Sequence, residues 1–214
     1  SELSAAGVDF IIVGAHALAA IGITRATGDL DIWVRPTPAN ASRVITALER
    51  FGAPLFDLTP ADLTAPDTVF QIGMVPSRID ILSGISGVTF EDAWAARQTA
   101  VLEGVTVSVL SRNHFIANKR ASGRTKDLLD LAKAKPGSVT FASPGNGTVA
   151  HLSGVRLQQA AGVKFEHIPY KSSTQMVQEL LAGQIDFTFQ NIAVVMPFVK
   201  AGKLRALVSS AKPQ

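Results

Sequence analysis

The chain has 214 residues and a mass of 22.5 kDa, enough for one large domain or two small ones. Hydrophobic residues make up 47% and charged residues 17%, which excludes intrinsic disorder over most of the length. The absence of cysteine excludes disulfides, thiolate metal sites and a cysteine nucleophile. The net charge of +3 is uneven, because residues 1–134 carry 12 Lys and Arg against 14 Asp and Glu, whereas residues 135–214 carry 8 against 3. The two parts therefore differ in chemistry.

The sequence indicates neither a membrane span nor a secretory signal. The apolar stretch from Ile11 to Ile23 is shorter than the roughly 20 residues that cross a bilayer, and His16 interrupts it. The first residues lack a basic region followed by an apolar one, so we expect a cytoplasmic location. The basic residues are scattered and not interleaved with aromatic ones, which disfavours nucleic acid as a partner.

Residues 8–133 alternate short β-like runs with helical patterns, which predicts a mixed α/β unit. The runs at 70–73 and 78–82 are expected to form a hairpin. Further strands are predicted at 8–13, 30–34 and 105–109, and helices at 15–21, 40–51 and 112–133.

The segment Lys135-Pro136-Gly137 breaks the pattern where the charge balance also changes, so we predict domains at 1–134 and 135–214. Strands separated by helices then imply a small parallel sheet. The strands are expected at 139–142, 165–168, 185–189 and 204–208, with helices ending near residues 161, 182 and 201. About 80 residues are near the lower size for independent stability, which predicts reliance on a partner.

The strongest chemical pattern is a set of three aspartates on two predicted strands. Asp29 and Asp31 are two residues apart, so both side chains project from one face of a strand, and the neighbouring strand can bring Asp80 beside them. Hard oxygen ligands of this kind hold the two Mg²⁺ ions of a phosphoryl-transfer site. The spacing alone leaves open that the three are exposed strand residues with no ligand.

Three segments carry a family resemblance: Val13-Gly14-Ala15-His16-Ala17, the run from Thr24 to Asp31, and Pro76-Ser77-Arg78-Ile79-Asp80. They resemble the nucleotidyltransferase fold of the DNA polymerase β superfamily. Within it, they are most similar to small stand-alone nucleotidyltransferase-like proteins of bacteria and archaea, related to the antitoxin half of some toxin–antitoxin pairs. The resemblance covers about residues 3–133 and includes similar segments at 40–44, 51–54, 87–94 and 119–127.

This resemblance implies Mg²⁺-dependent transfer of a nucleotide from a nucleoside triphosphate to a hydroxyl acceptor. Asp29 and Asp31 would then be metal ligands, and Asp80 a ligand and base. The turn at Gly14 and the following helix N-terminus would cradle the triphosphate, because free N–H groups favour anions. The family usually has Gly-Gly or Gly-Ser at this turn, whereas this chain has Gly14-Ala15, which removes a hydroxyl or some backbone freedom from the phosphate contact and leaves the metal site whole.

Cations near the carboxylates would balance the incoming phosphates, and four are candidates: Arg25, Lys119, Arg124 and Lys126. The alternative is a solvated helix face on which Lys126 pairs with Asp130, four residues later. His16 is expected to be structural, and Trp33 and Trp94 to belong to the core.

In the second part, the run from Ser143 to Leu152 is a Gly-rich turn that leads into a helix, a geometry that holds anions. Together with the segments at 161–163, 167–171 and 201–207, it resembles one lobe of the solute-binding proteins of tripartite tricarboxylate transporters. Those proteins are periplasmic and hold a small carboxylate between two lobes. The resemblance covers about residues 131–214, so Ser143, Gly145 and Thr148 would form one wall of a carboxylate site, with weak or no binding.

The two resemblances together predict a fusion, natural or engineered, joined around residues 131–136; the alternative is one native protein whose second domain has diverged to cover the first. The leading hypothesis is a Mg²⁺-dependent nucleotidyltransferase that uses a nucleoside triphosphate and an acceptor that the sequence leaves open. The alternative is a non-catalytic binding or interaction protein, either an antitoxin-like degenerate transferase with a protein partner or an orphaned carboxylate-binding lobe. Uncovered apolar surface on a lone lobe predicts self-association.

Overall fold

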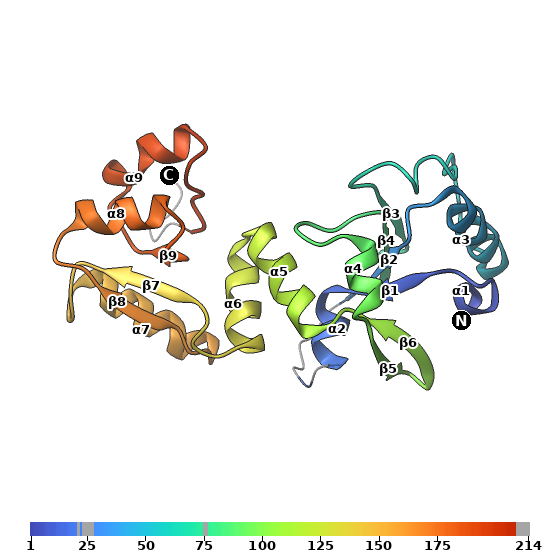
Figure 1. The fold of residues 1–214 in the computed structure, drawn as a ribbon, viewed down its shortest axis with the longest axis horizontal. Coiled ribbons are helices and arrows are strands. Elements are labelled where there is room, and N and C mark those ends of the chain that lie inside the picture. The colour runs from blue at the N-terminus through green and yellow to red at the C-terminus, as the bar shows by residue number, and fades with distance from the viewer. Residues whose placement is uncertain (21, 23–27, 75–76, 209–214) are drawn as a thin grey trace. The chain divides into compact units, whose positions relative to one another are not determined.

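The computed structural model describes residues 1–20, 22, 28–74 and 77–208 (Figure 1). The chain divides into two compact units, Ser1–Ser122 (unit 1) and Gly123–Gln214 (unit 2). Unit 1 contains a mixed sheet and unit 2 a small parallel sheet. The predicted fold class, a mixed-sheet α/β unit followed by a small parallel-sheet α/β lobe, is therefore confirmed. No helix within these described ranges is long and apolar enough to cross a membrane.

The sheet of unit 1 has the strand order β3-β4-β2-β1-β6-β5. β2 runs parallel to β4, and β1 runs parallel to β6, while the other neighbouring pairs are antiparallel. The predicted hairpin of β3 and β4 is thereby confirmed. The strands are β1 (Phe10–Ile12), β2 (Asp29–Val34), β3 (Val69–Ile72), β4 (Arg78–Leu82), β5 (Gln98–Leu102) and β6 (Val105–Val109).

The helices of unit 1 bury apolar stripes against this sheet or against one another. α3 buries Val44, Ala47 and Leu48, which have the helical spacing i, i+3, i+4, and it ends at Gly52, whose φ of 78° is left-handed. Trp33 is buried, as predicted, and its indole donates to the Ser83 carbonyl at 3.2 Å. The helices are α1 (Glu2–Ala5), α2 (Gly14–Ala20), α3 (Pro38–Phe51), α4 (Phe90–Ala95) and α5 (Arg112–Ser122).

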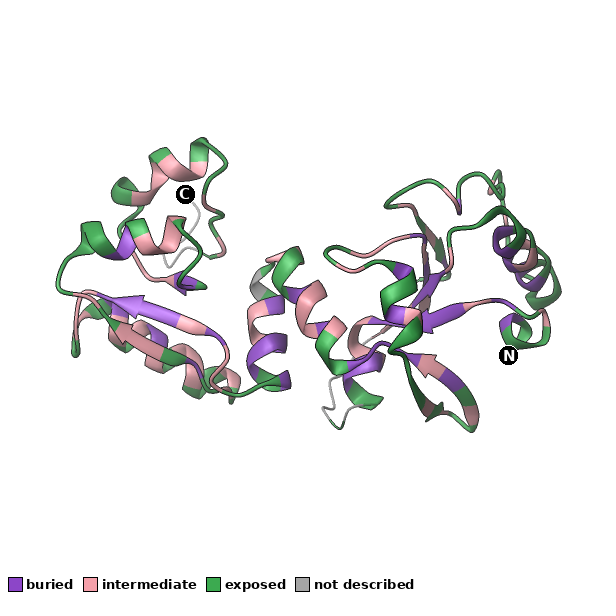
Figure 2. Ribbon diagram, viewed as in Figure 1, coloured by how far each residue is buried: buried purple, intermediate pink, exposed green. Residues whose placement is uncertain are grey.

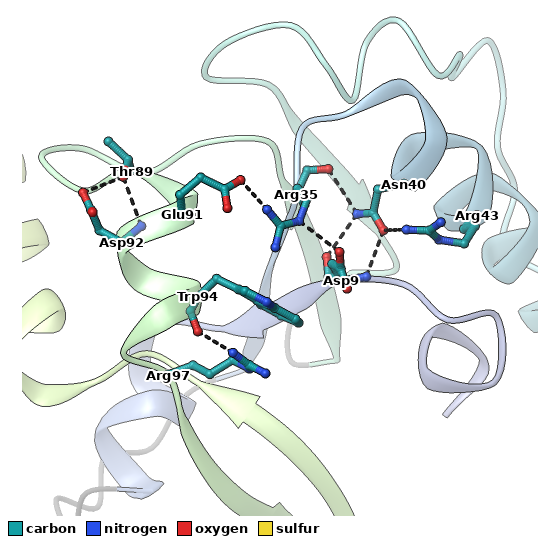
Figure 3. A network of polar contacts seen from close by, with 9 residues as sticks. All are labelled: Asp9, Arg35, Asn40, Arg43, Thr89, Glu91, Asp92, Trp94 and Arg97. Carbon is teal, nitrogen blue, oxygen red and sulfur yellow. Dashed lines mark hydrogen bonds and ion pairs between the residues drawn. The ribbon is translucent and has the colours of Figure 1, made fainter.

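A polar network ties β1, β2, α3 and α4 together (Figure 3). The fully buried Asn40 side chain accepts the Asp9 backbone N–H at 2.8 Å and donates to the carbonyls of Asp9 at 3.0 Å and Arg35 at 3.1 Å. The Arg35 guanidinium pairs with Asp9 at 2.9 Å and with Glu91, and its Cζ lies 4.8 Å from the centroid of the Phe90 ring. These contacts join segments that are far apart in the sequence.

Unit 2 is built around its central strand, β7 (Thr140–Ser143), which is parallel to β8 (Glu166–Pro169) and β9 (Phe187–Thr188) on its two sides. The connections from β7 to β8 and from β8 to β9 run in opposite directions. Their helices, α7 (Val149–Ala161) and α8 (Ser173–Leu181), therefore cover opposite faces of the sheet (Figure 1). α6 (Thr125–Ala134) precedes β7, and α9 (Ile192–Lys200) follows β9.

β7 is buried along almost its whole length, whereas α9 has no buried residue (Figure 2). On one face of the sheet the Phe141 ring contacts the rings of Phe165 and Phe187, with centroids 6.4 and 5.8 Å away. On the other face Ala142 packs with Met176 and Ile185. The core of unit 2 therefore lies on both sides of one strand.

Several predicted elements need correction. The helix predicted at 112–133 is two helices, because Gly123 adopts a left-handed φ of 57° and Arg124 is extended. The strand predicted at 204–208 is wrong: this mostly exposed segment does not pair with the sheet, and the N–H groups of Lys203 and Leu204 donate to the Phe198 carbonyl at the end of α9.

The sequence pattern also missed β5, α1 and α4. β5 and β6 are joined by Glu103-Gly104, which both have positive φ, as in the tight turns typical of β-hairpins, but without the usual Asn or Asp. The prediction that Trp94 belongs to the core is wrong: its side chain is only half-buried, and Arg97 covers its ring, with Cζ 3.9 Å from the centroid. α1 and α4 have four and six residues, too few for a periodic pattern to emerge.

Asn40→Ala should destabilise unit 1 by about 2–3 kcal/mol, because it removes the buried partner of the Asp9 N–H and of two carbonyls. Both tryptophans lie in unit 1, so urea unfolding followed by tryptophan fluorescence measures this unit. Ser42→Ala is the matched control: its exposed hydroxyl bonds only to the Pro38 carbonyl in its own helix, and its effect should stay within about 0.5 kcal/mol. Equal effects of the two variants would contradict the role given to Asn40.

Gly154→Ala should destabilise unit 2 by about 1–2 kcal/mol, because a Cβ at this position would lie 2.2 Å from the ring of the fully buried Phe141. Urea unfolding followed by the amide NMR signals of β7 measures unit 2. Gln159→Ala, on an exposed position of the same helix, should be nearly neutral. Unchanged or increased stability of Gly154→Ala would show that Phe141 does not restrict this position.

Candidate functional site

In unit 1 the structure brings the three predicted aspartates onto adjacent strands. β2 and β4 pair in a register that places Asp31 opposite Asp80 and Asp29 opposite Arg78. Asp80 is buried, and the other two aspartates are half-buried. Sequence spacing thus located these residues on neighbouring strands, but it did not assign a role to the arginine among them.

Arg78 neutralises part of the charge of this group of carboxylates. Its Nε lies 2.8 Å from Asp80 Oδ1, and its Nη2 lies 3.0 Å from Asp80 Oδ2 and 3.0 Å from Asp29 Oδ2. The hydrogen bond to Asp80, followed by the charges of Asp80, Asp29 and Asp31, raises the pKa of Arg78 above its usual value. Gly14 fits here because a Cβ on it would lie 1.9 Å from Asp31 Oδ2. Arg78 therefore binds both oxygens of Asp80 and one oxygen of Asp29.

A divalent cation at this place would compete with the Arg78 guanidinium for the same oxygens. Over the described residues, no group of three or more His, Asp or Glu side chains is arranged to hold a metal ion. In the arrangement present, the Arg78 guanidinium holds these oxygens. The magnesium site and the nucleoside triphosphate stay predictions, and the function proposed below does not depend on them.

The remaining residues predicted to contact a triphosphate belong to both units, and one of them lies outside the described residues. Arg25 lies outside the described residues. Ala15 is half-buried in the first turn of α2, and Lys119 is buried, with Nζ 5.3 Å from the centroid of the Phe115 ring. The other two cations belong to unit 2: Arg124 pairs with the buried Asp127 at 2.8 Å, and Lys126 is exposed on α6.

In unit 2 the three residues predicted to form a carboxylate wall are joined by hydrogen bonds. The Gly145 carbonyl accepts from the hydroxyls of Ser143 at 2.9 Å and Thr148 at 2.7 Å, and the Gly145 N–H donates to Ser143 Oγ at 3.2 Å. Gly145 has a φ of 140°, which side chains other than glycine rarely allow. We call residues 143–148 the β7–α7 loop.

Two histidines hold this loop, and the sequence analysis gave them no role. His167 on β8 places Nε2 at 2.7 Å from Ser143 Oγ, and His151 on α7 accepts the Gly147 N–H at Nδ1 at 3.1 Å. Their ring centroids are 4.4 Å apart, and the Phe141 ring stacks on His167 at 4.7 Å. The signal in the sequence was that both histidines occur within the segments of the C-terminal resemblance.

Burial lowers the pKa of His167 below its usual value, and the charge of His151 lowers it further. His167 is therefore neutral at pH 7. The single Ser143 O–H donates to the Gly145 carbonyl, so Nε2 of the His167 ring carries the proton and donates to Ser143 Oγ.

Comparisons with known proteins identify relatives of this chain. A family model described as "Tripartite tricarboxylate transporter family receptor" matches residues 64–213. A "UPF0065 protein in gbd 5'region" of Cupriavidus necator is 39% identical over 82 residues, which are 38% of this chain and 25% of that protein. The chain thus spans about a quarter of the length of this curated relative.

Two solved structures are also similar to parts of the chain. One, "Structure of a periplasmic transporter", is 36% identical with a TM-score of 0.37, and the match covers 40% of this chain and 28% of that one. The other, the solution structure of "Antibiotic-Resistance Factor ANT(2'')-Ia", is 15% identical with a TM-score of 0.42, and covers 62% of this chain and 76% of that one.

The family match corrects two predictions. Receptors of this family are periplasmic binding proteins, so the predicted cytoplasmic location is wrong. The same match overturns the description of the chain as a nucleotidyltransferase related to toxin–antitoxin pairs. The predicted resemblance of the C-terminal part to these receptors is confirmed, and the matched region begins earlier than predicted, at residue 64.

The lowered pKa of His167 makes the stability of unit 2 depend on pH. On acidification the unfolded chain takes up a proton at this residue before the folded chain does, so the folded state is progressively disfavoured. The contribution of His167 is fully present above about pH 6.5 and is lost as the pH falls toward the folded-state pKa. Urea unfolding of unit 2 at about pH 8 and about pH 5 should show the loss.

His167→Gln is the comparison for this prediction. Its side-chain amide can take the place of Nε2 beside Ser143 but does not titrate in this range, so the loss of stability between the two pH values should be smaller. An equal loss in both proteins would show that another group is responsible.

Proposed function

The chain belongs to the tripartite tricarboxylate transporter receptor family, and on this premise we propose that unit 2 binds a small carboxylate at the β7–α7 loop. The role is that of a binding protein without catalysis. The observation that carries the proposal is the position of the loop, between the end of a central parallel strand and the start of a helix.

The topology supports this place for a ligand. β7 connects to β8 on one side, while β9 lies on its other side, so the carboxyl end of β7 lies at the point where the strand order reverses. In open α/β sheets, ligands bind beside the carboxyl ends of strands at such a point. The exposed Asn146 and Gly147 lie on the loop that follows.

The chemistry of the loop supports an anion. The first helical hydrogen bond of α7 runs from the Leu152 N–H to the Thr148 carbonyl, so the N–H groups of Val149 and Ala150 point out of the helix N-terminus. The positive end of the helix dipole lies at the same place. The excess of basic residues in 135–214 adds a positive field that attracts carboxylates.

The strength of binding depends on how much of the ligand's surface the β7–α7 loop can cover by itself. Binding sites for small molecules usually bury 70–90% or more of the ligand, roughly twice what a single open loop provides. We therefore expect a Kd in the millimolar range for this chain, on the order of −4 kcal/mol. The periplasm is the proposed location, and a membrane component of the transporter is the proposed protein partner.

Titration of the ¹⁵N-labelled chain with citrate tests the proposal. The amide signals of residues 143–152 should shift, and those of α8 should not. Thr148→Val removes the hydroxyl that caps α7 and bonds to the Gly145 carbonyl, so it should weaken citrate binding about fivefold.

Thr174→Val is the matched control, because Thr174 is exposed in the first turn of a different helix and Ser172 caps that helix. It should bind citrate like the unchanged chain. Shifts that are absent at tens of millimolar citrate, or that occur only outside the loop, would refute a carboxylate site at this place.

A further inference from the structure

We propose that His151 and His167 are positioning residues that hold the β7–α7 loop in its ligand-binding shape, His151 through the Gly147 N–H and His167 through Ser143. The identity of the ligand rests on the proposed function, whereas the contacts belong to this chain alone. The inference adds two residues and a dependence on protonation to that site.

The first contact defines the state of His151. A backbone N–H can only donate, so Nδ1 of His151, 3.1 Å from the Gly147 nitrogen, carries no proton. In the neutral ring the proton is then on Nε2. His151 lies in the first turn of α7, and Gly147, with a φ of 79°, lies just before the residue that caps it. The ring therefore closes the end of the loop onto the helix.

The second contact fixes the start of the loop. Ser143 is fully buried at the end of β7, and its hydroxyl contacts both His167 Nε2 and the backbone of Gly145. A side chain from the neighbouring strand thus holds the first turn of the loop. With Thr148 bonded to the Gly145 carbonyl as well, the loop is anchored at both ends.

The two histidines also support each other. Their ring centroids lie 4.4 Å apart, and the Phe141 ring stacks beneath His167. Protonation of His151 would put a second donor in front of the Gly147 N–H and a positive charge beside His167. The contact with the Gly147 N–H therefore exists only while Nδ1 of His151 is unprotonated.

Among the described charged residues of these elements, Glu166, Arg156 and Asp186 do not face the pair. On β8, Glu166 precedes His167, and alternation along the strand places its side chain on the opposite face of the sheet. On α7, Arg156 is five residues after His151, which places it on another side of the helix. At the edge of the sheet, Asp186 accepts hydrogen bonds from the backbone and hydroxyl of Thr140.

The contact between His151 and Gly147 limits the N–H groups that a carboxylate can use. While His151 is neutral, the Gly147 N–H is used inside the protein, so the donors left for a carboxylate are those of the first turn of α7. Loss of the His151 contact would free Gly147 and loosen the loop. Carboxylate affinity should therefore depend on an acceptor at the position of Nδ1, not on the imidazole as such.

The test follows the Gly147 amide signal by NMR while the pH is lowered. In the unchanged chain the signal should move upfield as His151 is protonated and the hydrogen bond breaks. In His151→Asn the amide oxygen takes the place of Nδ1 and does not titrate, so the signal should stay near its neutral position throughout. In His151→Leu it should be upfield at every pH.

His114→Asn is the matched control, because His114 also uses Nδ1 for a hydroxyl contact, to Ser111 at 3.0 Å, but lies in unit 1. It should leave Gly147 as in the unchanged chain. A Gly147 signal that does not respond to pH, or that responds equally in His151→Asn and the unchanged chain, overturns the proposal.

Citrate titration of the same variants separates this inference from the proposed function. At neutral pH His151→Asn should bind as the unchanged chain does, and His151→Leu about fivefold more weakly. No citrate binding by any variant, with the Gly147 response intact, would refute the carboxylate function and support the positioning role. Equal binding by all variants, without a Gly147 response, would refute the positioning role alone.

Discussion

The structure of unit 2 depends on the position of one strand between two others. β7 pairs with β8 on one side and β9 on the other, and its side chains are buried on both faces. A strand held in this way cannot shift without breaking two ladders and two packed faces. The loop that follows at Ser143 therefore starts from a fixed point, and the hydrogen bonds of Gly145, Thr148 and the two histidines have a rigid base.

In unit 1 the main constraint is the electrostatic repulsion between carboxylates that lie close together on a sheet. Asp31 and Asp80 are opposite each other across parallel strands, and Arg78 on the same strand as Asp80 neutralises part of this charge. A pair of aspartates at i and i+2 is compatible with metal binding and with an ion pair to arginine alike. In the arrangement seen here Arg78 pairs with Asp29 and Asp80.

The proposed carboxylate site lies in the part of the chain that the family model matches. The match covers all of unit 2 up to residue 213, and in unit 2 the loop at the end of the central strand combines free helix N–H groups with a positive overall charge. The histidine pair contacts this loop at Ser143 and at the Gly147 N–H. A binding role for the chain therefore explains more of its features than a transfer reaction does.

The sequence by itself determined the fold class, most strands of both sheets, and the segments that form the loop, because alternating and helical apolar patterns and Gly-rich turns depend on nearby residues. Local pattern also placed Ser143, Gly145 and Thr148 in one Gly-rich turn, and their role as a carboxylate wall stays a prediction. It could not predict the hairpin turn at Glu103-Gly104 or the helix break at Gly123, because both depend on residues that adopt a positive φ. Only the tertiary structure showed that Arg78 pairs with two aspartates. It also showed that His151 and His167 contact each other beside one loop, because they lie on different elements that strand pairing brings together.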